Sequence, residues 1–482
     1  MKPDTKVLGG IWRGFVHTIG AFAAALVTGC AHYEARPLVP AQTAAILEAR
    51  SLAGPELRQF LTDSLGHDLA EWPAKTWDFE TLTWVAFHFH PSLAVARTQW
   101  DVARGGTKTA AGRPNPTVSA TPGYNLNAAS GVSPWFPGLT VDLPVETAGK
   151  RDKRIAQSRF LAEAAHQNVF TAAWQVRAEL RRALLDLTSA SRRADSVRNQ
   201  VALQRRMVEM LEQRRQAGAI SGLEVSTARV ALAKTEAEAG DAERMAVTTR
   251  SRVAQALGVP LAALAGRQFS DPFSLPLPGR SPEALAAARR QSLQSRPDIL
   301  AALATYEACQ AALQLEIAKQ YPDVHLGSGY QWDQGDNKWN LAVTLDLPLF
   351  NRNEGPIAEA GARRREAAAL FIAAQARVVG EVDAATAEHA AAKGQIAGLE
   401  NVTAALMKQA ERIELQIKAG AADRIESLGA QLELGVTRLA LLDAEAKAAL
   451  AAGQLEDALR IPFTNLKSVE NNPRPLTQSQ IP

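Results

Sequence analysis

VHLGSGYQWDQGDNKWNLAVTLDLPLF, residues 324–350, is the stretch of sequence that decides the fold. Apolar and polar side chains alternate along it on both sides of a polar turn at 334–337. The apolar set comprises Val324, Leu326, Tyr330 and Trp332, then Trp339, Leu341, Val343, Leu345, Leu347 and Leu349. Such alternation predicts a β-hairpin with one apolar and one polar face. Strands of about 10 residues with aromatic ends fit tilted membrane-spanning strands, and the alternative is a soluble hairpin that packs one face on a core.

The hairpin occurs twice, because the sequence contains an internal repeat. Residues 115–118 match 321–324 at a step of 206, residues 141–144 match 345–348 at 204, and residues 217–219 match 419–421 at 202. The first copy therefore places its hairpin at 116–146, with Val118, Ala120, Tyr124 and Leu126 on the apolar face. Asp142 and Asp346 fall on the polar faces and are predicted to line a lumen. The alternative is that neighbouring backbone groups satisfy the hydrogen bonds of these two carboxylates.

Long helices follow each hairpin. No proline or glycine interrupts residues 152–216, and apolar residues recur at seven-residue steps. The stripes comprise Leu180, Leu187, Ala194, Val201 and Val208, and in the second copy Val378, Ala385, Ala392, Leu399, Leu406 and Ile413. This spacing predicts coiled-coil rods on the order of 100 Å long. Each rod should turn at its glycine, Gly218 or Gly420, and a second helix should return to about 257 or 459. A helical segment should also open each copy, near 79–113 and 282–319.

The N-terminus is typical of an exported lipoprotein. A basic start and a short apolar stretch lead to Val27-Thr28-Gly29-Cys30, which resembles a bacterial lipobox. Cys30 would then carry acyl chains such as palmitate and anchor the mature chain, and the alternative is an ordinary signal peptide. The second cysteine, Cys309, is expected to be a small buried apolar residue.

These features divide the chain into six parts. We expect a signal peptide at 1–29, an N-terminal linker segment at 30–75, a first repeat at 76–265, an inter-repeat linker at 266–281, a second repeat at 282–463 and a polar tail at 464–482. The fold class is therefore mixed and mostly α, with an internal two-fold sequence repeat.

Export favours the membrane interpretation of the hairpins, as does the length of the flanking helices, which look too elongated to supply a core. Four strands cannot close a barrel around a lumen, and open strand edges in lipid leave backbone groups unpaired. The chain must therefore oligomerise. Three copies would supply twelve strands, an even number as in most bacterial barrels.

Composition excludes several other functions. A hydrophobic fraction of 46% and a charged fraction of 21% are those of a folded protein, and a net charge of +3 without a long basic run gives no support for nucleic-acid binding. No nucleophile elbow, phosphate-binding loop or dinucleotide motif is present, so an enzyme is not expected. His88 and His90 would point to different faces of a helix, and neither a metal site nor a cofactor is predicted.

The lipobox, the duplicated helix–hairpin–helix–helix units and the Leu-Asp-Leu-Pro-Leu-Phe run at 345–350 together resemble the TolC-like outer membrane factors. The resemblance covers about 76–463. It is closest to the lipoproteins paired with resistance–nodulation–division pumps, and the stretch at 90–97 is similar to the cobalt–zinc–cadmium branch. The resemblance implies a homotrimer: a twelve-stranded barrel in the outer membrane continued by a helical tunnel through the periplasm.

The resemblance also implies partners and site residues. A periplasmic adaptor would contact the turns Ala217-Gly218-Ala219 and Ala419-Gly420-Ala421, and an inner-membrane pump would load the duct. Acidic residues would close the tunnel: Glu426, its first-copy counterpart Glu224, and Asp423, because Gly429 stands where some members carry a second gate aspartate. Carboxylates near a pore axis attract cations and could pair with basic side chains of other helices; a solvated helix face is the alternative.

Three functions remain open at this point. The first is the exit channel of a tripartite efflux system. The second is the same duct serving a type I protein secretion system. The third is a periplasmic coiled-coil adaptor or structural lipoprotein without a pore, and the paired amphipathic strands argue against it.

Overall fold

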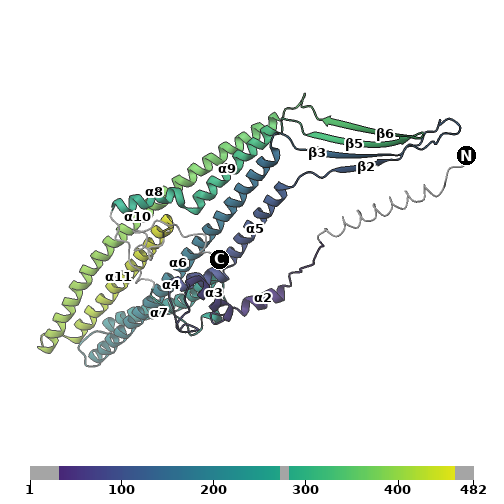
Figure 1. The fold of residues 1–482 in the computed structure, drawn as a ribbon. Helices are drawn as coiled ribbons and strands as arrows, with labels where there is room; N and C mark the ends of the chain where they lie inside the picture. Colours follow the sequence, from purple (N-terminus) through teal and green to yellow (C-terminus); the bar gives the residue numbers. More distant parts are fainter. Residues whose placement is uncertain (1–31, 272–281, 462–482) are drawn as a thin grey trace. The chain divides into compact units, whose positions relative to one another are not determined.

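The computed structural model describes residues 32–271 and 282–461 (Figure 1). Cys30 and the signal peptide, most of the inter-repeat linker, the last two residues of the predicted second repeat and the whole C-terminal tail lie outside these residues. The chain divides into two units, of which the first ends at Ala49 and contains the exposed helix α2 (Pro40–Glu48). The second unit begins at Arg50 and holds both repeats.

The second unit contains one series of elements twice. Helix α3 (Pro55–Leu65) and the short strand β1 (Thr76–Trp77) come before this series. The first copy comprises α4 (Phe79–Phe89), α5 (Pro91–Ala111), β2 (Thr117–Thr121), β3 (Gly138–Val145), α6 (Lys150–Gln216) and α7 (Gly222–Leu257). A short 3₁₀ turn, η1 (Leu261–Leu264), and β4 (Gln268–Phe269) follow. The second copy comprises α8 (Pro282–Ser295), α9 (Pro297–Ala318), β5 (Val324–Asp333), β6 (Asp336–Leu345), α10 (Glu354–Lys418) and α11 (Arg424–Leu459). The predicted repeat and the mostly helical fold are confirmed.

Each opening helical segment is two helices rather than one. The breaks fall at Pro91 and Pro297, which occupy the first turn of α5 and α9. Proline has no N–H to donate and disfavours a helical conformation in the residue before it. His90 and Arg296 are accordingly extended, with ψ of 124° and 136°.

The four long strands form one antiparallel sheet in the order β2-β3-β5-β6, so the two hairpins meet through β3 and β5. The second hairpin has a two-residue turn, Gln334 and Gly335, and both residues have positive φ. The expected turn also included residues 336 and 337, but these two belong to β6 and pair with β5. The first hairpin is shorter than expected. Pro122, Pro134 and Pro137 lack the N–H that a ladder needs, and Leu126 lies outside the strands.

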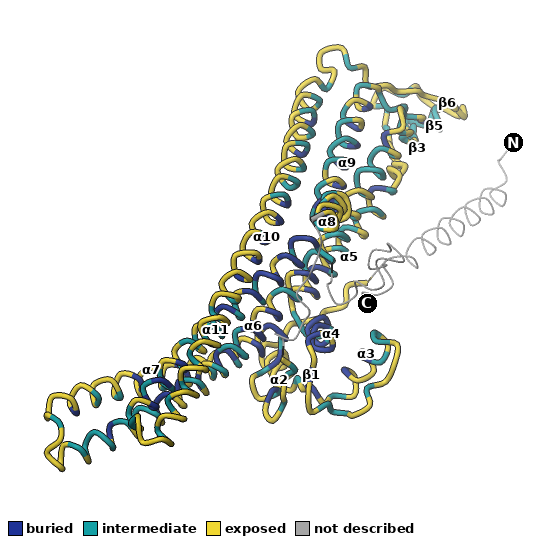
Figure 2. Tube along the Cα trace, turned by 90° about the vertical axis from the view of Figure 1, so that its left-hand side faces the viewer, coloured by how far each residue is buried: buried dark blue, intermediate teal, exposed yellow. Residues whose placement is uncertain are grey.

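The long helices pack as predicted. Helix α6 lies beside α7 and α10 beside α11, and both pairs are drawn side by side in Figure 1. All five first-copy stripe residues are buried. In the second copy the stripe is buried as far as Ala392 and half-buried beyond it, and Figure 2 shows the tips of the long helices mostly in the yellow and teal of exposed and intermediate residues.

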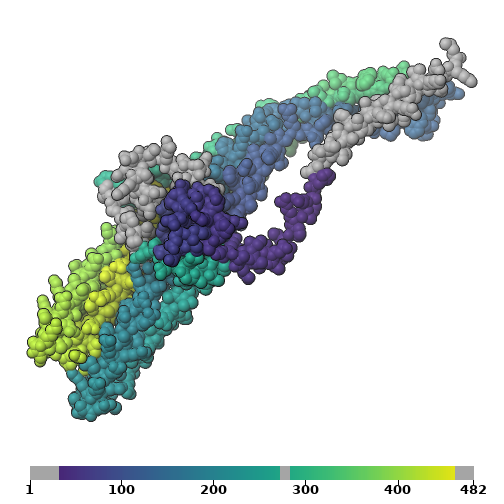
Figure 3. All heavy atoms as spheres, turned by 60° about the horizontal axis from the view of Figure 1, so that its bottom comes forward, coloured from purple at the N-terminus to yellow at the C-terminus, as the bar shows by residue number. Residues whose placement is uncertain are grey.

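Each repeat has its own hydrophobic core beside the long helices. The first gathers α3, α4, α6 and α7 around fully buried Leu61, Leu82 and Leu180, and Figure 3 shows α3 and α4 in purple against the teal helices. Helix α3 thus lies within the stretch assigned to the N-terminal linker and is packed there. The second core gathers α8, α9, α10 and α11 around Val378 and Leu459.

An arginine ties the helix ends together in each copy. The guanidinium of Arg50 donates to the carbonyls of Phe89 and Gly258, at 2.9 and 2.6 Å, where α4 and α7 end. In the second copy Arg296 donates to the carbonyl of Ala458 at 2.6 Å, near the end of α11. A cation at a helix C-terminus satisfies carbonyls that have no partner within the helix.

A buried charged cluster joins the two repeats, and we call it the repeat joint: Arg177 and Arg181 of α6 with Glu456 and Asp457 of α11. Arg177 Nη1 lies 2.6 Å from Glu456 Oε1, and Arg181 reaches Glu456 Oε2 and Asp457 Oδ1 at 3.0 Å. Both guanidiniums also lie over the ring of Phe79. Burial lowers the pKa of Arg177 and raises the pKa of Asp457, because both charges are withdrawn from water.

Gly453 makes room for the repeat joint. Its carbonyl accepts a hydrogen bond from Arg181 at 2.9 Å, and a Cβ at this position would lie 2.7 Å from Arg181 Cδ. The ion pairs with Glu456 and Asp457 fix the Arg181 guanidinium, so its side chain cannot move away from an added methyl group. Gly453→Ala should therefore lower the free energy of unfolding by about 1–3 kcal/mol through overpacking.

Denaturant unfolding of the full chain in detergent, followed by circular dichroism, measures this loss. Gly429→Ala is the matched control on the same helix, since a Cβ there meets nothing within 4 Å. It should gain up to about 1 kcal/mol from helix propensity. Equal effects of the two substitutions would contradict the role of Gly453.

Candidate functional site

Two regions of the second unit hold the predicted site residues: the helix tips, where α6 turns into α7 and α10 into α11, and the sheet. At the tips Gly218 and Gly420 adopt φ of 75° and 74°. The amides of Ala219 and Ala421 bond back to the carbonyls of Arg214 and Gln416, at 2.9 and 2.8 Å. This is the Schellman arrangement, and it explains why each turn has glycine between two small residues.

One ion pair connects the two tips. Arg214, in the last turn of α6, bonds to the carboxylate of Asp423, which caps the N-terminus of α11 by accepting from the amide of Ile425. The Arg214 guanidinium lowers the pKa of Asp423 below its ordinary 3.8. We call this pair the tip latch, because it joins the end of the first repeat's rod to the second repeat's return helix.

The other two predicted gate residues lie close by and have different contacts. Glu224 and Ser221 form a capping box at the start of α7, each side chain bonding the other's backbone amide. Glu426 is exposed in the first turn of α11, and within the described part of the chain its carboxylate forms no hydrogen bond or ion pair. Sequence reasoning did not include Arg214, although its position four residues before Gly218 placed it in the last turn of the rod.

The sheet exposes its apolar side chains. Leu341 and Trp339 of β6 are 78% and 79% exposed, and the row continues past the strand through Leu347, Leu349 and Phe350. The strands β2 and β6 form the two edges of the sheet and pair with no further strand among the described residues. The uncovered face leaves apolar side chains exposed, and the two open edges leave backbone N–H and C=O groups unpaired. One chain alone cannot cover this face or pair these edges.

The polar face of the sheet carries a histidine–aspartate pair. Asp142 of β3 lies opposite Gly327 of β5, and its Oδ2 is 2.9 Å from Nδ1 of His325 on the same face. Asp346 directly follows β6 and is exposed. The alternation in 324–350 puts His325 on the polar face, but its partner could not be predicted, because the pairing of β3 with β5 could not be read from the chain.

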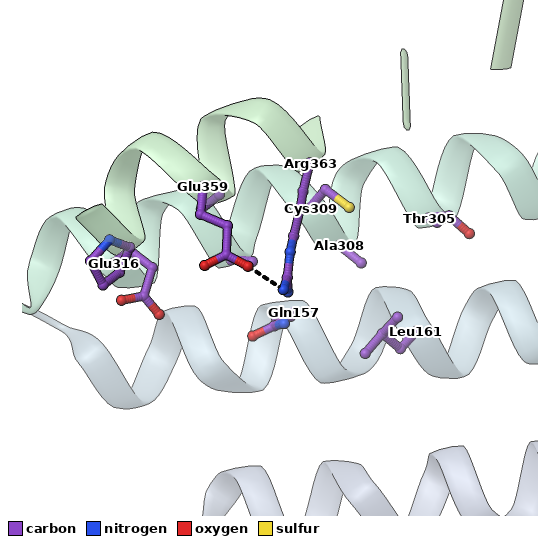
Figure 4. Close-up of a pocket in the computed structure, with 11 residues that line it drawn as sticks. Gln157, Leu161, Thr305, Ala308, Cys309, Glu316, Glu359 and Arg363 are labelled. Atoms are coloured by element: carbon purple, nitrogen blue, oxygen red, sulfur yellow. Dashed lines mark hydrogen bonds and ion pairs between the residues drawn. The ribbon is translucent and has the colours of Figure 1, made fainter. Parts of the chain in front are cut away.

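A hollow of about 250 Å³ lies between α6, α9 and α10. Figure 4 shows Gln157 on α6, Cys309 on α9 and the ion-paired Glu359 and Arg363 on α10. Cys309 is half-buried and borders this hollow rather than lying within a core.

The two histidines that were rejected as a ligand pair have separate contacts: His88 packs on the ring of Phe60, and Nδ1 of His90 bonds Ser92. Among residues 32–271 and 282–461 no group of three histidine, cysteine or acidic side chains is placed to hold a metal ion.

Within the same residues, no helix is both long and apolar enough to cross a bilayer.

Comparison with known proteins identifies the class. The profile of the outer membrane efflux protein family matches residues 86–259 and 288–459, one segment in each repeat. These segments cover well over half of the 482 residues. The chain therefore belongs to the outer membrane efflux protein family, a family of channels and not of enzymes, and the resemblance to TolC-like proteins is confirmed.

Among curated proteins, the chain is similar to the cobalt-zinc-cadmium resistance protein CzcC of Cupriavidus metallidurans. The two are 26% identical over 270 residues, which are 55% of this chain. The chain spans 61% of the length of that relative. The similarity to the cobalt–zinc–cadmium branch is therefore that of a distant homologue.

Solved structures share the fold. The channel protein CusC superposes with a TM-score of 0.66 at 19% identity, over 82% of this chain and 95% of CusC. The outer-membrane channel OprN gives 0.66 at 20% identity, over 90% and 98% of the two chains. The outer membrane protein VceC of Vibrio cholerae gives 0.64 at 22% identity, over 80% and 96%. All three support the TolC-like fold.

Proposed function

We propose that the chain is the outer-membrane exit duct of a tripartite efflux system, working as a homotrimer with a periplasmic adaptor and an inner-membrane resistance–nodulation–division pump. The observation that carries this proposal is the four-stranded sheet with an exposed apolar face and two open edges. Because backbone groups cannot stay unpaired in lipid, the edges β2 and β6 must pair with other copies. Three copies supply a closed barrel of twelve strands.

The two faces of the sheet then have distinct environments. The row that includes Leu341 and Leu345 contacts lipid, and the face with Asp142, His325 and Asp346 lines the lumen. The coiled-coil pairs α6–α7 and α10–α11 continue the barrel as a helical tunnel through the periplasm. The chain passes substrate passively, since energy for transport comes from the pump.

The tips close the tunnel and contact the adaptor. In this proposal the turns at 217–219 and 419–421 form the adaptor-binding surface. Asp423 keeps the second repeat's tip against the first through Arg214, and Glu426 contributes an uncompensated carboxylate to an acidic ring, which favours cations. Glu224 primarily supports the start of α7 as a helix cap.

Attachment and domain division are part of the same proposal. Acylated Cys30 anchors the chain in the outer membrane, in addition to the contact that the barrel makes with lipid. The two repeats span about 76–265 and 282–463. The mass of the purified mature chain would reveal the acyl chains; an unmodified Cys30 would remove the anchor from the proposal.

A pair of adjacent residues tests the placement of the sheet. Leu341 and Ala342 are neighbours in the middle of β6 and belong to opposite faces. Leu341→Arg would put a charge into lipid, at a cost of about 2–4 kcal/mol near the bilayer midplane. We expect it to abolish most of the trimer in outer-membrane fractions.

Ala342→Arg is the matched control and should leave the trimer intact, because a lumen accommodates charge. Native mass measurement of protein extracted from outer membranes gives the readout. Equal losses for the two variants would contradict the assignment of the faces, and a wild-type monomer would contradict the barrel.

The cargo separates efflux from the alternative, an outer-membrane duct of a type I protein secretion system. A strain lacking the gene should become sensitive to metals, dyes or antibiotics and should recover on complementation. A deletion strain with unchanged sensitivity but a missing secreted protein would favour the secretion duct.

A further inference from the structure

The polar face of the sheet holds an imidazole that one carboxylate orients. Nδ1 of His325 lies 2.9 Å from Oδ2 of Asp142, and the two side chains are 36% and 34% exposed. An ionised carboxylate only accepts hydrogen bonds, so Nδ1 carries the proton. In the neutral ring the lone pair then resides on Nε2, which has no hydrogen-bond partner in the described part of the chain.

A second donor lies beside this ring. Val324 is opposite Leu345, and His325 is opposite Thr344, so Asp346 is on the same face as His325 at a diagonal position. No hydrogen bond or ion pair of the Asp346 carboxylate occurs within residues 32–271 and 282–461. Asp323 differs, because Lys150 Nζ and the amide of Thr147 already bind it at 2.7 and 2.9 Å.

This combination of donors selects one class of ligand. A metal-binding histidine usually donates its other ring N–H to a carboxylate, as His325 does to Asp142. Imidazole nitrogen suits zinc, copper and nickel ions, whereas magnesium prefers oxygen ligands only. With one nitrogen and one carboxylate from the chain, water completes the coordination. Binding is therefore weak, as conduction requires.

We propose that His325, oriented by Asp142 and assisted by Asp346, transiently binds divalent transition-metal cations at the helix-side mouth of the barrel, one in each protomer. The inference rests on the proposed function for its position in the lumen, and it names transition-metal cations as a substrate class of the duct.

Zinc binding to the chelator-washed full chain in detergent tests the site without requiring transport. The wild type should bind one more Zn²⁺ per chain than His325→Gln. Asp142→Asn retains an oxygen that accepts from Nδ1 but loses the charge, and should weaken this binding about 10–100-fold. His67→Gln removes an exposed histidine elsewhere and should leave the site unchanged. Equal zinc binding by the wild type and His325→Gln would overturn the proposal.

Planar-bilayer conductance connects the site to the channel. Zn²⁺ should reduce the wild-type current at concentrations at which Mg²⁺ has no effect, and His325→Gln should need at least roughly tenfold more Zn²⁺ for the same reduction. An unchanged zinc response in His325→Gln would overturn the role of this site in transport. Zinc binding that depends on His325 in a chain that forms no channel would instead overturn the proposed function.

Discussion

Glu456→Ala should lower the free energy of unfolding by about 3–5 kcal/mol, the usual cost of leaving buried charge without its partner. Glu456 is the carboxylate that Arg177 and Arg181 share in the repeat joint, and its side chain is 7% exposed. Its removal leaves Asp457 as the remaining acid of the repeat joint beside the two guanidiniums. Denaturant unfolding of the full chain in detergent measures the loss.

Two further variants separate charge from packing. Glu433→Ala removes an exposed acid from the same helix and should change stability by less than about 0.5 kcal/mol. Glu456→Leu combined with Arg177→Met, Arg181→Met and Asp457→Asn removes all four charges of the joint and keeps side chains of similar size, and should recover part of the loss. A Glu456→Ala chain as stable as the Glu433→Ala chain would show that the joint does not hold the repeats together.

Opening of the tip latch should have the largest effect on conductance. Arg214→Ala and Asp423→Asn each break the pair, and the asparagine keeps a capping oxygen for α11. In the proposed trimer each chain contributes one exposed latch pair, worth about 0.2–1 kcal/mol. All three pairs must break when the tunnel opens. Their loss should weaken the closed state by about 0.6–3 kcal/mol, roughly a 3–150-fold rise in the ratio of open to closed channels. Single-channel recording in planar bilayers measures that ratio.

Arg229→Ala is the control for the latch. Arg229 pairs with Glu212, so this ion pair joins α6 to α7 within the first repeat and does not reach the second. Its loss should leave the open fraction unchanged. If Arg229→Ala opened the channel as far as Arg214→Ala, the latch would have no specific role.

The latch also has a defined pH dependence. Because the folded pKa of Asp423 lies below its ordinary value, the pair is fully present above pH 3.8 and is lost as pH falls through the lowered pKa. The latch is therefore charged throughout the neutral range, and mild acidification to pH 5 does not release it.

Much of this architecture could be predicted from the sequence, because each element has a local signal. Alternation in 324–350 predicted the second hairpin, and seven-residue spacing from Leu180 to Val208 predicted the packed rod. Gly218 and Gly420 indicated the turns because a Schellman end needs a residue with positive φ. The repeat supplied what single motifs could not, since two weak patterns in the same order support one another.

The remaining features depend on distance in space rather than in sequence. The pairing of Asp142 with His325 follows from the register of β3 against β5, which join different repeats, and nothing local to either strand specifies it. Arg181 and Gly453 are 272 positions apart, and a glycine inside a helix gives no indication that an arginine crosses it. In the first hairpin, alternation predicted strands across 116–146, but the prolines between 122 and 137 cannot donate to the ladder, and the strands are shorter.

The order β2-β3-β5-β6 has a consequence for the symmetry of the assembly. Within one chain, the second strand of the first hairpin pairs with the first strand of the second hairpin. Closing the proposed trimer joins β6 of one chain to β2 of the next, which is again a second strand meeting a first strand. The ring thus has six quasi-equivalent hairpin junctions. Three of these junctions lie within a polypeptide, so half of the junctions between hairpins form by folding and do not depend on protein concentration.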